Sequence, residues 1–115
     1  MSNWKYREGS QESKSLDAVT TGTGRAISFQ DYNSVHWIIE GSAGVATGAV
    51  VIESATSQNF AGTWKLLAGP VTVVANAQLG DKFDFPPGAF VRARVSTDIT
   101  GGTVTVYLNG LRQEQ

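Results

Sequence analysis

Apolar and polar residues alternate with a period of two along most of the chain after residue 16. This period is typical of β-strands with one buried face, because successive side chains point to opposite sides of a sheet. The clearest example is the segment FVRARVSTDITGGTVTVYLNGL at 90–111, which predicts two strands. Residues 98–102, DITGG, predict a turn that joins them into a hairpin, since glycine adopts positive φ without steric cost. The residues predicted to face inward are Val91, Ala93, Val95, Val104, Val106 and Leu108.

Shorter strand-like runs precede this segment at regular spacing, and turn-forming residues separate them. They lie at 16–21, 25–30, 35–40, 46–55, 62–67, 71–76 and 82–85. The run at 46–55 contains Val50, Val51 and Ile52, which make it apolar on both faces there, as a central strand would be. No segment has a convincing helical period. About eight short strands predict an all-β protein, an antiparallel β-sandwich of jelly-roll or Greek-key type.

We expect a single sandwich domain at 16–112, a polar N-terminal arm at 1–15 and a C-terminal tail at 113–115. The arm contains two aromatic residues, Trp4 and Tyr6, which a fully solvated segment would not need. The predicted core consists of Ile27, Phe29, Val35, Trp37, Ile39, Val50, Ile52, Trp64, Leu66, Val73, Phe83, Phe85, Val91, Val95, Val104, Val106 and Leu108. Truncation of Trp37 or Trp64 should cost the most stability, because these are the largest side chains of the set.

Composition and charge exclude several classes of function. A net charge of −1 leaves no basic surface typical of nucleic-acid binding. The absence of cysteine excludes disulfides and thiol catalysis. The N-terminal residues lack the apolar segment of a signal peptide, and the apolar runs are shorter than a membrane span. We therefore expect neither a nucleic-acid nor a membrane partner, and synthesis in a cytoplasm.

No catalytic or metal-binding motif is present, so we expect no enzyme, no cofactor and no metal site. His36 is the single histidine and cannot form a zinc site without cysteine ligands. A GxSxG motif is missing, and the acidic residues are scattered. Asp31, Asp81 and Asp98 are predicted in turns, where hydrogen bonds to the backbone explain them. A calcium site in the loops and a glycosidase carboxylate pair remain the chemical alternatives.

Arg92 and Arg94 project from the same face of one predicted strand, next to Phe90. One interpretation is that cross-strand acids such as Glu40 or Glu53 neutralise them. The other is that they contribute to a subunit contact, because arginine and aromatic residues are enriched at interfaces. The full set of candidate subunit or capsid contacts is Trp4, Tyr6, Phe90, Arg92, Arg94 and Tyr107.

Three segments carry a resemblance to a known group of proteins: SVHWIIEGSAG at 34–44, AVVIESATSQNFAGTWKLL at 49–67 and FVRARVSTDITGGTVTVYLNG at 90–110. They are similar to segments of small structural proteins of tailed bacteriophages, namely head-decoration, head-fibre and tail-associated sandwich modules. None of the matched positions is a catalytic or ligand-binding motif, so the resemblance transfers no site.

The resemblance implies a virion structural protein, most simply a capsid decoration (cement) protein that binds the capsid exterior and stabilises the shell. Its expected partners are the major capsid protein and copies of itself, as a dimer or trimer, with the arm reaching onto a neighbour. The alternative is a carbohydrate- or receptor-binding module of a tail or fibre that binds a host glycan through Tyr32, Tyr107 or Trp4. An enzyme would need a deep cleft that contains His36 and two acids.

Overall fold

The computed structural model describes residues 3–6, 13–29, 32, 34–84 and 90–114, with the side chains of 3–6, 83–84 and 111–114 left aside. This part of the chain contains no α-helix. Its nine strands are β1 (Asn3–Tyr6), β2 (Lys14–Val19), β3 (Ile27–Ser28), β4 (Ser34–Gly41), β5 (Thr47–Ala55), β6 (Lys65–Thr72), β7 (Gln78–Asp84), β8 (Phe90–Thr100) and β9 (Val104–Glu114).

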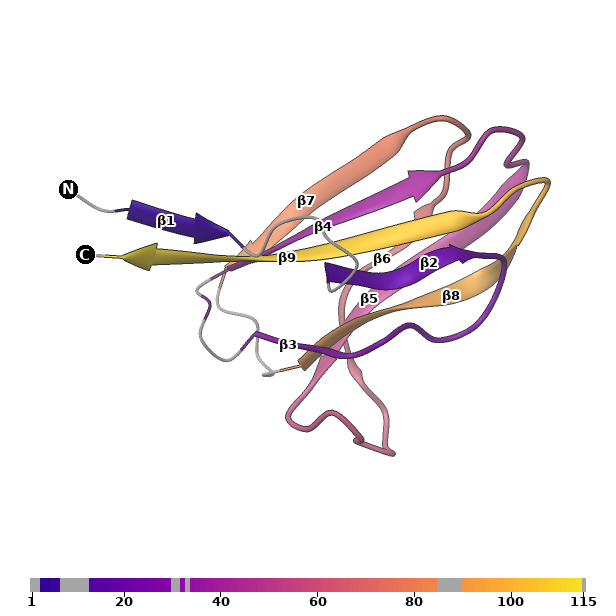
Figure 1. Ribbon diagram of the computed structural model, residues 1–115. Coiled ribbons are helices and arrows are strands. Elements are labelled where there is room, and N and C mark those ends of the chain that lie inside the picture. The colour runs from indigo at the N-terminus through magenta and orange to yellow at the C-terminus, as the bar shows by residue number, and fades with distance from the viewer. Residues whose placement is uncertain (1–2, 7–12, 30–31, 33, 85–89, 115) are drawn as a thin grey trace.

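The strands form two antiparallel sheets (Figure 1). One has the order β1-β9-β4-β7 with β2 also pairing β9, and the other has the order β3-β8-β5-β6. The chain folds like one long antiparallel hairpin, whose successive strand pairs are β2–β9, β3–β8, β4–β7 and β5–β6. This hairpin is folded over into two sheets, in which β4 pairs with β9 and β5 pairs with β8. This connectivity is that of a jelly roll. The predicted all-β antiparallel sandwich is confirmed.

The predicted hairpin at 90–111 is wrong in its pairing, although the alternation in its two strands is correct. β8 pairs with β3 and β5 in one sheet, whereas β9 pairs with β1, β2 and β4 in the other. The inward faces of β8 and β9 therefore meet across the core instead of lying side by side. β8 continues through Asp98 to Thr100, with Ile99 buried, so the turn is shorter than predicted.

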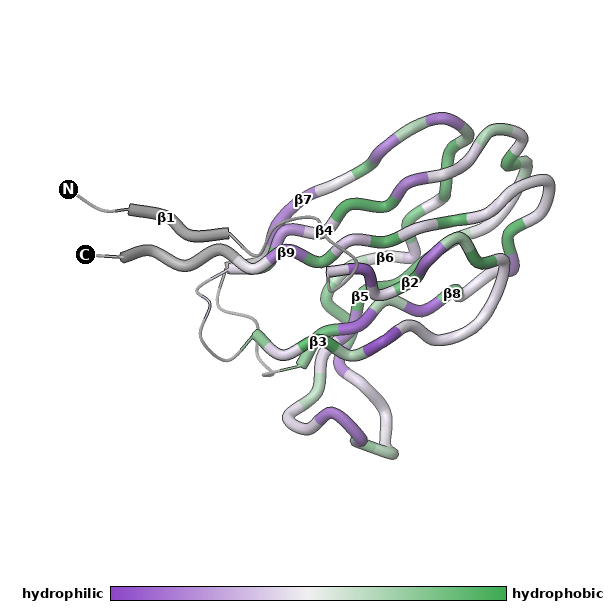
Figure 2. Tube along the Cα trace, in the orientation of Figure 1, coloured by the Kyte–Doolittle hydropathy of each residue, from purple (hydrophilic) through white to green (hydrophobic). Residues whose placement is uncertain are grey.

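The core between the sheets contains most of the predicted residues, and the alternation of hydrophobic and polar positions that produces it is visible in Figure 2. Leu66 is exposed rather than buried, and Trp64 is buried but lies outside this core. Leu16 and Ile99 are core residues that the prediction missed. Two predicted members cannot be compared, since the side chain of Phe83 and all of Phe85 lie outside the described residues.

One strand, β6, replaces two predicted ones. The chain passes through Gly69 and Pro70, which are joined by a cis peptide bond, and continues as strand to Thr72. β6 is at the edge of its sheet, where proline is tolerated because one side of the strand donates no ladder hydrogen bonds. Register shifts against β5 between Val50 and Glu53 accommodate the extra residues.

The chain ends pair with each other. β1 runs antiparallel to the last part of β9, from Asn3 opposite Glu114 to Tyr6 opposite Leu111. Figure 1 shows these two segments projecting together from one end of the sandwich. The expected arm at 1–15 thus contains β1 and the start of β2, and the expected tail at 113–115 contains the last residues of β9.

Candidate protein interaction surface

The outer face of the β3-β8-β5-β6 sheet brings together charged, aromatic and apolar residues from β5, β6, β8 and the loop between β5 and β6. Because Val50 and Ile52 face the core, the alternation along β5 points Glu53 outward. The register places Glu53 opposite Arg92 of β8 and opposite Leu66 of β6. Arg94 follows Arg92 on the same face of β8, since Ala93 between them is in the core.

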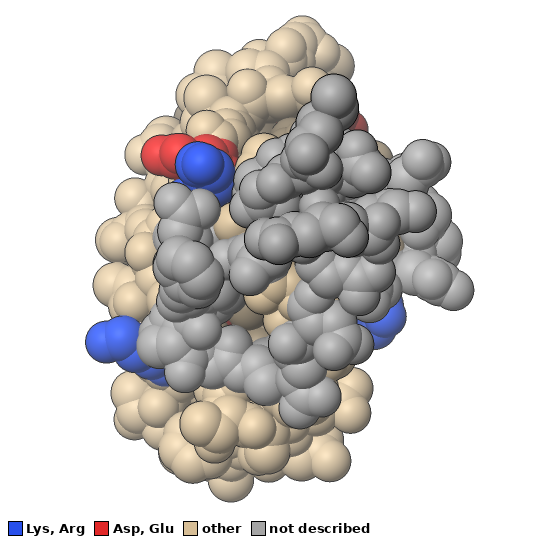
Figure 3. Space-filling view, turned by 90° about the vertical axis from the view of Figure 1, so that its left-hand side faces the viewer, with Lys and Arg blue, Asp and Glu red and all other residues tan. Residues whose placement is uncertain are grey.

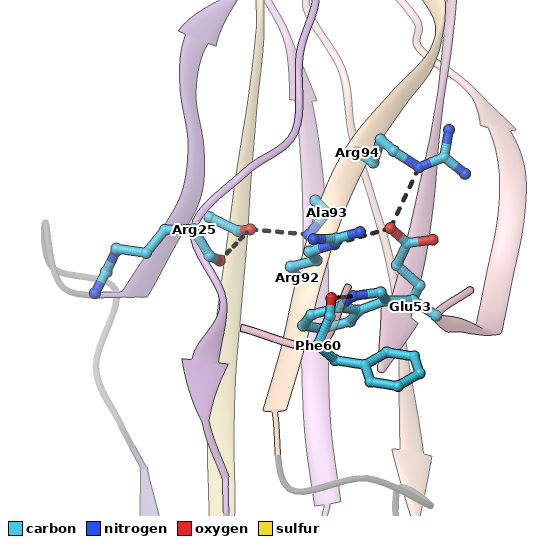
Figure 4. A network of polar contacts seen from close by, with 8 residues as sticks. Arg25, Glu53, Phe60, Arg92, Ala93 and Arg94 are labelled. Carbon is cyan, nitrogen blue, oxygen red and sulfur yellow. Dashed lines mark hydrogen bonds and ion pairs between the residues drawn. The ribbon is translucent and has the colours of Figure 1, made fainter. Parts of the chain in front are cut away.

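Glu53 is a buried carboxylate that two arginines bind. Its Oε1 accepts a hydrogen bond from Nε of Arg92 at 2.9 Å and one from Nε of Arg94 at 3.2 Å (Figure 4). The exposed fractions of the side chains are 6% for Glu53, 22% for Arg92 and 42% for Arg94. A carboxylate this buried needs charged partners to offset its desolvation. Of the two acids proposed to neutralise the arginines, Glu53 does so, whereas Glu40 lies in the other sheet and accepts from Gln78.

Trp64 anchors the loop between β5 and β6 to this face. The guanidinium of Arg92 stacks on its ring at 3.8 Å from the centroid, and its Nε1 donates to the carbonyl oxygen of Phe60 at 2.9 Å. The indole of Trp64 was predicted to fill the core between the sheets. It is instead buried on the outer face of the β3-β8-β5-β6 sheet. Val51 and Ala55, which are also buried outside the central core, lie on the same outward side of β5.

The accessible side chains of this region include Arg94, Phe60 and Leu66. Phe60 is 42% exposed and Leu66 is 54% exposed. We call these three, together with the Glu53, Arg92 and Trp64 that support them, the Arg94 patch. Sequence reasoning had identified the arginines but missed Phe60 and the outward position of Leu66. An available signal was Glu53 itself, the single charged residue of the predicted strand at 46–55.

Of the other predicted contact residues, Phe90 lies on the same face of β8 as Arg92, opposite Ala55 of β5, whereas Tyr107, Trp4 and Tyr6 lie on strands of the other sheet. Tyr107 is on β9, in the opposite sheet, where Nζ of Lys14 lies 5.7 Å from the centre of its ring. Because β8 and β9 belong to different sheets, Tyr107 does not lie on the same sheet face as Arg92 and Arg94. Trp4 and Tyr6 are in β1, and their side chains lie outside the described residues.

The remaining polar residues are dispersed over the molecule. Asp81 and Asp98 lie within β7 and β8 instead of in turns, and Asp98 accepts a hydrogen bond from Thr21 at 2.8 Å. Asp31 lies outside the described residues. His36 is on β4, in register with Lys82 and Asn109. In the end-on view of Figure 3, the lysines and arginines that are visible occupy separate places.

Among residues 13–29, 32, 34–82 and 90–110, no three His, Asp or Glu side chains are grouped so that they could hold a metal ion. The described strands and loops also include no helix of the length and hydrophobicity needed to span a membrane. An open groove of about 490 Å³ lies at the β4–β7 end of its sheet, and its lining residues are Glu40, Gly41, Ser42, Asn76, Ala77 and Gln78.

No protein-family model matches the chain, and no curated protein matches it. Among solved structures, the chain is similar to the SPBc2 prophage-derived protein YomS, with a TM-score of 0.64. The alignment covers 96% of this chain and 95% of that chain at 15% sequence identity. At this identity the likeness shows a shared fold.

Proposed function

We propose that the chain is a non-enzymatic structural protein of a tailed bacteriophage particle, and specifically a capsid decoration (cement) protein. The observation that carries the proposal is the fold likeness to a prophage-derived protein over 96% of this chain and 95% of the other. Two further arguments support it: jelly rolls are common in viral capsids, and the segments at 34–44, 49–67 and 90–110 are similar to phage sandwich modules.

The mechanism of such a protein is adhesion. The sandwich is a rigid body that would dock on the major capsid protein at the outer surface of the shell and bury area that the bare shell leaves open. Each contact can be weak, because many symmetry-related copies reinforce the shell together. Copies of the chain would associate as a dimer or trimer around a symmetry axis of the capsid.

The test is the number of copies in particles of the phage that encodes the chain. Quantitative mass spectrometry should give hundreds of copies per particle, comparable with the major capsid protein, and cryo-electron microscopy should place them on the capsid exterior. A dozen copies or fewer would assign the chain to the tail or portal, and complete absence from purified particles would refute a virion role.

The open groove favours a second candidate, a glycan-binding module of a tail or fibre. Its carboxylate, hydroxyl and amide groups, from Glu40, Ser42, Asn76 and Gln78, are of the kinds that bind sugar hydroxyls. Tyr32, one of the aromatic residues proposed to bind a glycan, packs its ring against Phe29 with 5.7 Å between centroids. Binding on a glycan array that is lost in Gln78→Ala would support this candidate over decoration.

A further inference from the structure

The Arg94 patch combines one available cationic head with two exposed apolar side chains on a rigid support. We propose that it docks an acidic and apolar segment of a partner protein, with a partner carboxylate on the terminal nitrogens of Arg94 and partner apolar side chains against Phe60 and Leu66. The proposal rests on the proposed function only for the identity of the partner, a protein of the phage shell.

The charges of the patch favour an anion. Two guanidinium groups and one carboxylate leave a formal charge of +2 − 1 = +1 at this site. Arg94 binds Glu53 through Nε, and within the described part of the chain its two terminal nitrogens have no other partner. Figure 4 shows these nitrogens turned away from Glu53. The terminal edge of a guanidinium matches the two oxygens of a carboxylate, which it binds with paired hydrogen bonds.

The cationic head is held in place before any partner arrives. Arg92 is fixed between the ring of Trp64 and the carboxylate of Glu53, and Glu53 in turn fixes Nε of Arg94. The more buried arginine therefore supports the carboxylate, and the more exposed one presents its free edge. A side chain that is already ordered loses less conformational entropy on binding, which favours affinity.

The two apolar anchors are also positioned by the fold. The ring of Phe60 lies over Gly62, where an added Cβ would be 2.6 Å from the ring carbon Cζ. The carbonyl of Phe60 accepts the indole hydrogen bond of Trp64, so the loop is tied to the sheet at this residue. Leu66 projects from β6 directly opposite Glu53. Of the three large apolar side chains described as exposed, Phe60, Leu66 and Val74, two thus belong to this patch.

These features favour a protein segment over a small anion or a charged sugar. A phosphate would use Arg94 alone, and a sialic acid could offer only its small acetamido methyl group to Phe60 or Leu66. An arginine beside exposed apolar side chains is instead the composition of interface hot spots, where a few anchors supply most of the binding energy.

The first experiment is an NMR titration of the ¹⁵N-labelled full chain with the peptide acetyl-Glu-Leu-Glu-Phe-Glu-amide. Resonances of Phe60, Leu66 and the Nε–H of Arg94 should shift, and Kd should rise at least about fivefold in Arg94→Gln. The matched control is Arg25→Gln, which removes the same charge from an exposed arginine outside the patch and should bind like the wild type. The spectrum of each variant reports whether it is folded.

Three results of the titration would overturn the proposal. They are equal affinity in Arg94→Gln and Arg25→Gln, equal affinity for the peptide in which Gln replaces Glu, and shifts of the same size with 3′-sialyllactose. Concentration-dependent shifts at Arg94 without peptide would show that a second copy occupies the patch, and would also contradict it.

The second experiment separates this proposal from the proposed function. Purified protein is added to phage particles that lack it, and bound copies are counted for the wild type, Arg94→Gln and Arg25→Gln. Loss of binding in Arg94→Gln alone supports both ideas. Equal binding of all three leaves the decoration role standing and refutes the docking patch. Peptide binding without any particle binding refutes the decoration role and retains the patch as an acidic-segment site.

Discussion

Arg92 and Arg94 occupy equivalent positions in the sequence pattern but have different roles in the fold. Both donate through Nε to the same oxygen of Glu53. Only Arg92 also stacks on Trp64, and this second contact buries it more deeply. A guanidinium that is both ion-paired and stacked on an indole loses much of its hydration, so its interactions are stronger than those of an exposed pair. Arg92 therefore contributes mainly to stability, and Arg94 is available for binding.

Replacement of Arg92 by alanine should lower the free energy of unfolding by about 2–4 kcal/mol, because it removes the stack on Trp64 and the shorter hydrogen bond to buried Glu53. The Arg92→Lys variant should keep only part of the stability that Arg92→Ala loses, since an ammonium group lacks the planar face that stacks on the indole. Arg94→Ala should cost about 1 kcal/mol or less, as expected for a partly exposed ion pair. Urea denaturation measures all three variants, and equal losses at the two positions would contradict the division of roles.

At the scale of elements, the alternating pattern predicted which face of a strand is buried but not which strands pair. Val91 and Val104 are both buried as predicted, yet they belong to different sheets. A period of two shows only that one face of a strand is buried. It does not show whether the next strand along the chain pairs with it in the same sheet or lies across the core in the other sheet. The pairing of a jelly roll is set by contacts between distant segments, which short-range patterning does not contain.

Bulges explain why Leu66 was wrongly assigned to the core. Glu53 pairs with Leu66 and Ile52 pairs with Ala68, so one step along β5 corresponds to two along β6. Each such extra residue reverses the alternation on the bulged strand, and positions before it change face. The apolar pattern of 62–67 was recognised correctly, but the sequence gives no direct sign of where β6 is irregular.

The turn between β8 and β9 packs against the turn between β4 and β5, and glycine is required where they touch. Gly101 has a φ of 81°, and a Cβ there would collide with the carbonyl oxygen of Gly44. Gly101→Ala should therefore lower the free energy of unfolding by about 2–3 kcal/mol. Gly22→Ala is the matched control: it also has a positive φ, of 108°, but an added Cβ meets nothing within 4 Å. Thermal unfolding should show the larger loss for Gly101→Ala, and a loss at Gly22 as large or larger would contradict the packing argument.

At the scale of the whole molecule, the fold class was predictable and the candidate surface only in part. Strand number and alternation predicted a two-sheet sandwich, because each strand needs a partner layer over its apolar face. The importance of Arg94 could be suspected from Phe90, Arg92 and Arg94 on one face of a strand. Phe60 could not be placed, since a loop residue has no alternation to assign its face. Its position depends on the hydrogen bond and stacking of Trp64, which only the folded loop creates.

The last residues of the expected N-terminal arm at 1–15 contact the sandwich. Ser15 lies on β2, in one sheet, and its hydroxyl accepts a hydrogen bond from the backbone N–H of Ala93, on β8 in the other, at 2.8 Å. The same hydroxyl donates to the carbonyl of Arg25 at 2.8 Å. Both Ser13 and Ser15 are buried. Ser15 thus links the two sheets near their edge.

Two truncations should consequently behave differently. Removal of residues 1–12 deletes β1, which among the described strands pairs only with β9, and should change the free energy of unfolding by about 1 kcal/mol or less. Removal of residues 1–15 also takes Ser15 and leaves the N–H of Ala93 and both the N–H and the carbonyl of Arg25 without this partner, which should cost a further 3 kcal/mol or so, on the order of three lost hydrogen bonds of which one is buried. Urea denaturation of both chains measures the difference, with Ser15→Ala as the single-residue counterpart and the exposed Ser96→Ala as its control.

If the two truncated chains are equally stable, Ser15 does not hold the sheets together. If they differ as expected, the chain lacking 1–12 is the correct reagent for asking whether the N-terminal segment contributes to binding phage particles, because its body is intact.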